Sequence, residues 1–275
     1  HSQKNKQMIQ DKKYFYNLEE FLNSSLQSYQ ALHIDLSDNK ISGENISVLG
    51  SGLGKFTNLL SLVLHLSENQ INDEKASKLG SGLANCANLQ YLILDAAYNQ
   101  IGSIGAQCLV SGLTNCTNLT NLILRLDYNQ IGAIGVKGLS STLEMCTNLS
   151  SLTLGLNYNE IGDEGTSGLG FTLAQYTNLS NLTLDLQLNK IADGGASSLG
   201  SGLANCINIQ ILTLDLQLNQ IDLIGASGLI SALSNCTNLS NFTLNLSYNK
   251  INNSQKLKVK SLKIKRLVVL KIKCI

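Results

Sequence analysis

The sequence predicts an α/β fold: a right-handed solenoid of about eight strand-turn-helix repeats of 30 residues, curved into an arc with a parallel sheet on its concave face. Before each recurring asparagine, leucines alternate with the period of a strand, and after it apolar residues follow with the period of a helix. The asparagines keep a spacing of 30 residues without a slip: Asn39, Asn69, Asn99, Asn129, Asn159, Asn189, Asn219 and Asn249.

The strand of each repeat is clearest at Leu122, Leu124 and Leu126, just before Asn129. Alternate side chains of a strand point to opposite faces of a sheet. We therefore expect the leucines to face the core and the residues between them to face solvent.

The helix of each repeat follows the asparagine. Ala106, Leu109, Leu113 and Cys116 have spacings of three and four, which place them on one helical face. Asp163 is predicted to be an N-cap. A glycine recurs near the helix start, and such a position needs unusual backbone angles or approaches a neighbour closely: Gly105, Gly135, Gly165, Gly195 and Gly225. Strands joined through helices must run parallel with right-handed crossovers.

Three parts are expected along the chain: an N-terminal helical cap over residues 1–30, the repeat array over 31–253, and a basic capping rung over 254–275. Apolar residues at helical spacing, including Phe15, Leu18 and Phe21, predict one amphipathic helix over residues 14–32. This helix would cover the open end of the first repeat. A partner-binding helix is the alternative.

The last segment keeps an apolar alternation, with Val269 and Ile272 falling 30 residues after Leu239 and Phe242. Its lysines would discourage pairing at an exposed sheet edge. A basic strip that docks on an acidic or lipid surface is the alternative to this capping role.

Composition limits the classes of function. Residues 253–275 hold eight of the 20 Lys and Arg residues and no acidic residue, so the rest of the chain carries 12 basic and 19 acidic side chains. An acidic body is a poor partner for nucleic acid. No apolar run approaches the roughly 18 residues of a membrane span. Five cysteines share one repeat slot with Phe56 and Tyr176, so we expect buried free thiols rather than disulfides and a cytoplasmic location.

The pattern L-x-x-L-x-L-x-x-N-x-[LI], here with an extra Leu-x pair before the asparagine and followed by x-x-x-G-x-x-x-L-x-x-x-L, is seen from Leu122 through Asn129 and Gly135 to Leu143. With it, the chain from about residue 30 to 253 resembles leucine-rich repeat proteins of the ribonuclease-inhibitor-like class. The resemblance implies that the concave face and its rims bind other proteins, and that the asparagine bonds to turn backbone. The repeat is slightly longer than usual, so we expect a longer strand or a bulge.

One concave column begins with Asp35, His65, Asp95 and Arg125, whose alternating charges can pair across strands. Further along it, Asp185 and Asp215 have no such neighbour. These two carboxylates are a candidate site for a cationic group of a partner. A solvated acidic face is the simpler interpretation.

Apolar side chains gather in a second column. Val63, Ile93 and Ile123, with Tyr91 beside them, predict an exposed apolar contact surface; cover by the N-terminal segment or plain strand propensity would also explain them. At the strand ends, tyrosines favour binding on a concave rim, although a stacked structural ladder fits equally. This rim column comprises Tyr98, Tyr128, Tyr158 and Tyr248, with Leu188 and Leu218 in the same slot.

No phosphate-loop, dinucleotide, zinc-protease or CxxC motif is present. Asp35, His65 and Asp95 lack a nucleophile in their column, so we expect no catalysis, cofactor or metal site. The predicted function is a protein-binding scaffold or adaptor, as a monomer or a subunit of a hetero-complex such as a cytoskeletal assembly. The alternatives are the sensing portion of a longer receptor or kinase-like chain, and a GTPase-activating protein that uses Arg125.

Overall fold

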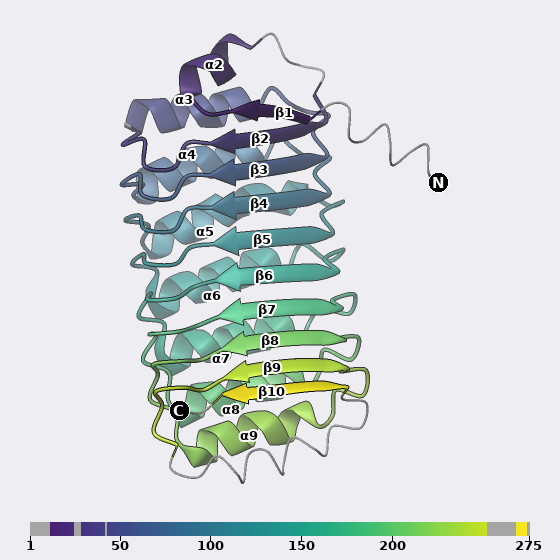
Figure 1. The fold of residues 1–275 in the computed structure, drawn as a ribbon. Coiled ribbons are helices and arrows are strands. Elements are labelled where there is room, and N and C mark those ends of the chain that lie inside the picture. The colour runs from purple at the N-terminus through teal and green to yellow at the C-terminus, as the bar shows by residue number, and fades with distance from the viewer. Residues whose placement is uncertain (1–11, 25–28, 42, 252–267, 274–275) are drawn as a thin grey trace.

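The computed structural model describes residues 12–24, 29–41, 43–251 and 268–273. Within these ranges, the strands form one sheet in chain order, and every neighbouring pair is parallel (Figure 1). The strands are β1 (Lys12–Phe15), β2 (Ala31–Asp35), β3 (Ser61–His65), β4 (Tyr91–Asp95), β5 (Asn121–Arg125), β6 (Ser151–Gly155), β7 (Asn181–Asp185), β8 (Ile211–Asp215), β9 (Asn241–Asn245) and β10 (Val269–Lys273).

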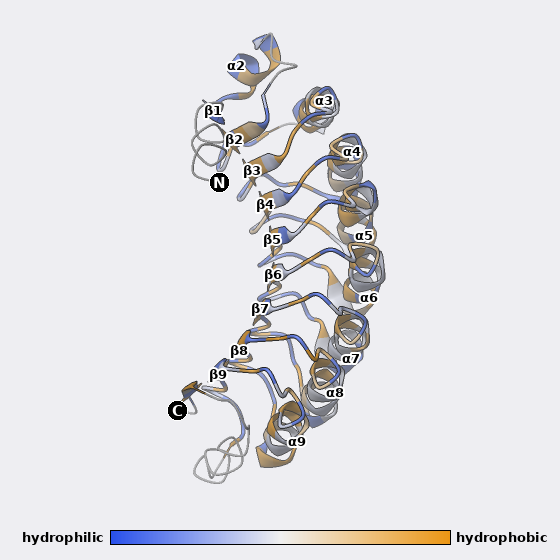
Figure 2. Ribbon diagram, turned by 90° about the vertical axis from the view of Figure 1, so that its right-hand side faces the viewer, coloured by the Kyte–Doolittle hydropathy of each residue, from blue (hydrophilic) through white to orange (hydrophobic). Residues whose placement is uncertain are grey.

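The helices connect successive strands and lie along the outer side of an arc, while the strands line its inner, concave side (Figure 2). Packed helices need about 8–10 Å between axes, whereas paired strands need only about 4.8 Å, so stacking the repeats bends the array. The predicted solenoid is therefore confirmed. The helices are α2 (Leu18–Asn23), α3 (Gly43–Leu53), α4 (Asp73–Leu83), α5 (Ser103–Ser111) with the 3-10 turn η1 (Gly112–Asn115), α6 (Gly132–Leu143), α7 (Gly162–Leu173), α8 (Asp193–Leu203) and α9 (Leu223–Leu233).

The core is a stack of leucines in register. Leu64, Leu94 and Leu124 are Cα partners on successive strands, and each is at most 1% exposed. The strands from β2 to β9 are five residues long, with one partner per residue. The expected bulge is therefore absent from these strands, while the expectation of a longer strand stays a prediction. Backbone hydrogen bonding between neighbouring repeats continues beyond the strand, as where the Leu66 N–H donates to the Asp95 carbonyl at 2.7 Å.

The recurring asparagines join each repeat to the one before it. Asn189 is fully buried, and its Nδ2 donates to the carbonyls of Leu156 at 2.8 Å and Gln187 at 3.0 Å. Its Oδ1 accepts from the backbone N–H groups of Asn159 at 2.9 Å and Ile161 at 3.3 Å. One side chain thus satisfies four backbone groups in a region that water does not reach. The expected bonding of the asparagine to turn backbone is confirmed.

Asp163 is not an N-cap, because α7 already begins at Gly162. Its Oδ1 instead accepts the Ala192 N–H of the next repeat at 2.6 Å. The recurring glycine makes room for this contact: a Cβ on Gly195 would lie 2.6 Å from Asp163 Oδ1 and 2.9 Å from its Cα. The predicted close approach at this glycine is confirmed.

The N-terminal segment differs from the single helix expected over residues 14–32. Lys12–Phe15 forms β1, and Phe15 pairs with Ile34 and is fully buried. The helix α2 covers only six residues and begins after Asn17, whose side chain accepts the Glu20 N–H. Phe15 is the last residue of β1, directly before a bend at Tyr16 and Asn17, and its pairing with Ile34 overrides the helical spacing.

Phe21 is the residue of α2 that meets the first repeat. Its ring lies 5.4 Å from that of Phe15 and 5.7 Å from that of Phe56, and it is 2% exposed. This packing covers apolar surface at the open end of the array. The capping role of residues 1–30 stays a prediction, and residues 1–11 and 25–28 lie outside the described ranges.

At the C-terminal end, β10 pairs with β9 as predicted but in a different register. Leu270 aligns with Phe242 and Ile272 with Leu244, an offset of 28 residues instead of the expected 30. A shift of two residues keeps every side chain on the same face of a strand. The predicted alignment is therefore wrong. Ile272 packs against the core, whereas Val269 is 39% exposed. Residues 252–267 lie outside the described ranges.

The cysteine slot is buried, and its thiols are free. Each thiol donates to a backbone carbonyl of the preceding repeat. Cys206 donates to Leu173 at 2.9 Å and Cys116 to Cys86 at 3.3 Å, and the Tyr176 hydroxyl donates to the Leu143 carbonyl. Burial raises the pKa of the Cys116 thiol to about 12 and that of Cys86 to about 11. Within the described residues, no helix has the length and apolar character needed to cross a membrane.

Replacing Asn189 with Ala is expected to lower the free energy of unfolding by about 2–4 kcal/mol, because buried backbone groups left unpaired cost about 1–3 kcal/mol each. The matched control is Asn39→Ala, since Asn39 is exposed and its side chain bonds, among the described residues, only to the Ser37 carbonyl. The control should lose less than about 0.5 kcal/mol. Equal losses in urea unfolding, followed by circular dichroism, would contradict the structural role.

Alkylation with iodoacetamide at pH 8 is expected to modify Cys108, which is partly exposed, long before the buried thiols. A thiol with a pKa of about 11 is ionised in only about one molecule in a thousand at this pH. Peptide mass spectrometry after timed quenching measures each site, and the urea-unfolded chain provides the fully reactive control. Rapid native labelling of Cys116 would show that the slot opens.

Candidate functional site

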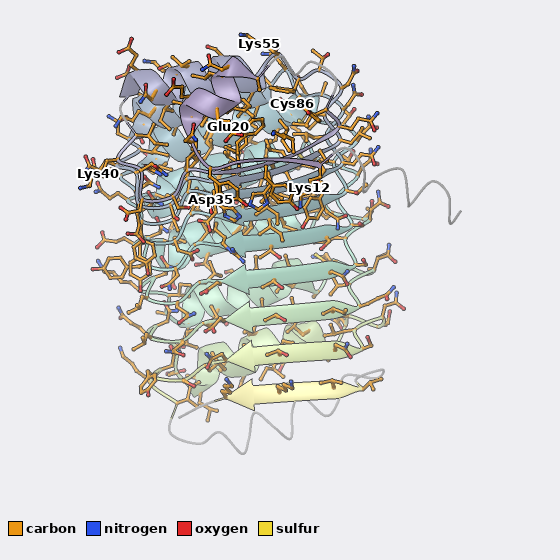
Figure 3. The ribbon with its side chains drawn as sticks, turned by 45° about the horizontal axis from the view of Figure 1, so that its top comes forward. Lys12, Glu20, Asp35, Lys40, Lys55 and Cys86 are labelled. Carbon is orange, nitrogen blue, oxygen red and sulfur yellow. The ribbon has the colours of Figure 1, made fainter. Side chains whose placement is uncertain are left out.

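The strand register places one column of side chains along the concave face at the carboxyl ends of the strands. Lys12 and Asp35 are seen on the strand side of the array, and Cys86 lies on the helix side (Figure 3). The column runs through Asp35, His65, Asp95, Arg125, Gly155, Asp185, Asp215, Asn245 and Lys273.

The N-terminal half of this column is internally paired, as predicted from its alternating charges. Asp95 Oδ2 lies 3.6 Å from the Arg125 guanidinium and 3.8 Å from His65 Nδ1. These groups are partly exposed, so each pair contributes at most about 1 kcal/mol. Across the described part of the chain, no group of three or more His, Cys, Asp or Glu side chains could hold a metal ion.

The C-terminal half of the column holds Asp185 and Asp215 side by side on β7 and β8. Amide groups orient both carboxylates. The Asp185 carboxylate accepts one hydrogen bond from the Gln187 backbone N–H at 3.3 Å and another from the side-chain Nε2 of Gln187 at 3.1 Å. Asp215 accepts the Gln217 N–H at 3.1 Å and Asn245 Nδ2 at 3.0 Å. None of the ion pairs among the described residues involves either carboxylate.

Folding makes it harder to ionise Asp185. Burial raises the pKa of the Asp185 carboxyl, the hydrogen bonds from Gln187 lower it, and the neighbouring Asp215 raises it further. The net result is a pKa above the ordinary value. A cation supplied from outside would relieve both the burial cost and the repulsion.

Asp127 is a third acidic residue at this place, and the sequence analysis missed it. Its Oδ1 accepts the Asn157 N–H at 2.9 Å, and its Oδ2 lies where a side chain of Gly155 would stand, 2.5 Å from the ideal Cβ position. Burial raises the pKa of Asp127, and the nearby Asp185 contributes to the rise. The lone glycine in a column of polar residues was the signal that could have revealed it.

The predicted apolar patch is only partly exposed. Val63 is 7% exposed, because His33 and Ile93 flank it on the neighbouring strands of a concave surface. Ile93, Ile123 and Tyr91 are half-buried. The expectation of an exposed patch is wrong for Val63, while the other three side chains still border solvent.

The tyrosines of the rim form a stacked ladder. The rings of Tyr98 and Tyr128 lie 4.3 Å apart, and those of Tyr128 and Tyr158 lie 5.2 Å apart, in nearly parallel planes. Tyr98 and Tyr158 remain about half exposed, at 52% and 54%. The rings contact one another, as expected of a structural ladder. The binding role of these exposed tyrosines stays a prediction.

Beside this ladder lies a small pocket of about 200 Å³. Tyr158, Leu188 and Leu218 supply its apolar part. Glu160 and Lys190 stand at its edge and pair with each other at 2.7 Å. The pocket is smaller than the roughly 300–1,000 Å³ of small-molecule sites, and its volume suits one side chain.

The geometry defines the class of protein as a parallel α/β solenoid with a solvent-facing concave sheet. A family model described as leucine-rich repeat matches residues 146–170 and 178–200. These segments span two successive units of the same 30-residue pattern that continues on both sides. Over these two segments the chain is similar to leucine-rich repeats.

Among solved structures, the chain is similar to internalin C2 from Listeria monocytogenes strain 4b F2365, with 21% sequence identity and a TM-score of 0.42. The match covers 81% of this chain and 83% of internalin C2. No curated protein matches the chain.

Asp185→Asn is expected to keep or raise the melting temperature at pH 7. A carboxyl whose pKa is raised on folding loses stability as the pH rises from the unfolded toward the folded pKa, and the neutral amide avoids this loss. The variant's advantage over the unmodified chain should grow from pH 3 to pH 7. Asp95→Asn is the control, since its loss of pairing with Arg125 predicts slight destabilisation. Clear destabilisation by Asp185→Asn would contradict the unpaired state of the carboxylate.

Proposed function

We propose that this chain is a non-catalytic scaffold or adaptor that binds another protein through its concave sheet. The observation that carries the proposal is the C-terminal half of the concave column, where Asp185 and Asp215 are oriented by amides and have no cationic partner among the described residues. Unpaired, partly buried charges in a concave surface suit an electrostatically complementary macromolecule.

The face also offers half-buried apolar and aromatic side chains in Tyr91, Ile93 and Ile123, and a tyrosine rim that includes Tyr98 and Tyr128. Interfaces are enriched in such tyrosines. Buried thiols support a reducing, cytoplasmic setting, and a subunit of a hetero-complex is the proposed assembly. A GTPase-activating role through Arg125 receives less support, because its guanidinium is already 3.6 Å from Asp95.

The test is capture from an extract of the native source by the immobilised 275-residue chain, with quantitative mass spectrometry. Asp185→Lys combined with Asp215→Lys is expected to reduce recovery of the specific partner about tenfold or more, because like charges across an interface are repulsive. Its melting curve should stay close to that of the unmodified chain.

The matched control is Glu44→Lys combined with Glu164→Lys, which makes the same change of net charge on the exposed helix side. Recovery should not change with this control. Equal recovery with both double variants would remove the acidic pair as a binding site.

A further inference from the structure

Two features of the C-terminal half of the array lie next to each other and have different chemistry. On the concave face, Asp185 and Asp215 form an acidic pair, and three residues further along each chain segment, Leu188 and Leu218 line the rim pocket. Extended chain advances about 3.3 Å per residue, so the two features lie within about 10 Å of each other.

The acidic pair has capacity for a further donor. A carboxylate offers about four lone-pair positions, and the hydrogen bonds at Asp185 and Asp215 come from the amide groups of Gln187, Gln217 and Asn245. Asn157 Oδ1 adds a buried oxygen that has no hydrogen-bond partner among the described residues. It lies beside Asp127, to which the Asn157 N–H donates.

The pocket is suited to an apolar side chain. Its apolar residues are Tyr158, Leu188 and Leu218, and the Glu160–Lys190 pair cancels the charge at its edge. Leu218 is 40% exposed, which leaves apolar surface for a ligand to cover. Burying such surface contributes roughly 25 cal/mol per Å².

The backbone at this slot gives no local reason for leucine. Leu188 and Leu218 have φ values of 54° and 56°, in the left-handed region that favours Gly, Asn and Asp. Leucine there is strained and partly exposed at once. Strained positions that persist are a reason to look for a function in the side chain.

We infer that this place binds an extended segment of another protein that carries a Lys or Arg side chain within about three residues of a large apolar side chain. The basic group lies between Asp185 and Asp215, and the apolar side chain enters the pocket of Tyr158, Leu188 and Leu218. Phosphate-rich ligands are disfavoured by the acidic pair. The inference rests on the proposed function, because it names the chemistry of the partner at the same concave face.

The experiment selects displayed random 12-residue peptides on the full 275-residue chain and then measures synthetic copies of the enriched peptides by fluorescence anisotropy. Enriched peptides are expected to share a basic residue two to four positions from Leu, Ile, Met or Phe. Asp185→Asn with Asp215→Asn should weaken them about tenfold to a hundredfold, as expected for lost charge-assisted hydrogen bonds, and their affinity should fall with added salt.

Leu188→Gln with Leu218→Gln should weaken the same peptides by about tenfold, independently of salt. Glutamine already occupies a left-handed conformation at Gln70, so the substitution suits the backbone. Ile104→Gln with Ile134→Gln is the control, since both isoleucines are well exposed on the helix side, and it should leave affinity unchanged.

The inference is overturned if no peptide is enriched, if the enriched peptides lack the basic and apolar pair, or if neither double variant weakens them. Ile93→Gln with Ile123→Gln separates this failure from failure of the proposed function. If only that variant weakens peptide binding, binding to the concave face is supported and the site at Asp185 and Asp215 is rejected. Peptides that no concave variant weakens would count against both.

Discussion

The structure depends on one kind of hydrogen bond, which joins a buried asparagine to the backbone of its neighbouring repeats. Each repeat packs mainly against the repeats on either side of it, so its stability comes from these neighbours. Asn189 shows how this is achieved, with four backbone groups satisfied by one side chain. The aspartate of the helix start repeats the principle, because Asp163 bonds to the following unit at Ala192.

Because the backbone is satisfied inside the array, the concave side chains are free to differ between repeats. The N-terminal half uses this freedom to neutralise itself through Asp95 and Arg125. In the C-terminal half, Asp185 and Asp215 have no counter-ion among the described residues. Burial raises the pKa of the Asp185 carboxyl there. The face therefore has two electrostatically different halves, which meet where Asp127 lies over Gly155.

The repeat period made most of the fold predictable, since Leu64, Leu94 and Leu124 can face only one way in a parallel sheet. The errors arose where a distant neighbour decides. Asp163 resembles a local cap, yet the N–H group that it accepts belongs to Ala192, 29 residues further along the chain. Phe15 has helical spacing, yet an adjacent strand offers it better burial. The Asp127 carboxylate occupies the space that a side chain at Gly155 would fill. The two residues belong to neighbouring repeats, so the pattern of one segment does not predict this position.

The left-handed residue before each asparagine has a consequence for how such a surface can change. Asp38, Glu68, Tyr98 and Leu188 share nearly one backbone conformation, with φ between 51° and 61°. The path of the loop is thus the same for acidic, aromatic and aliphatic side chains, none of which is branched at Cβ. Mutation at this slot can exchange acidic, aromatic and aliphatic chemistry while leaving the scaffold intact, so recognition can evolve separately from architecture.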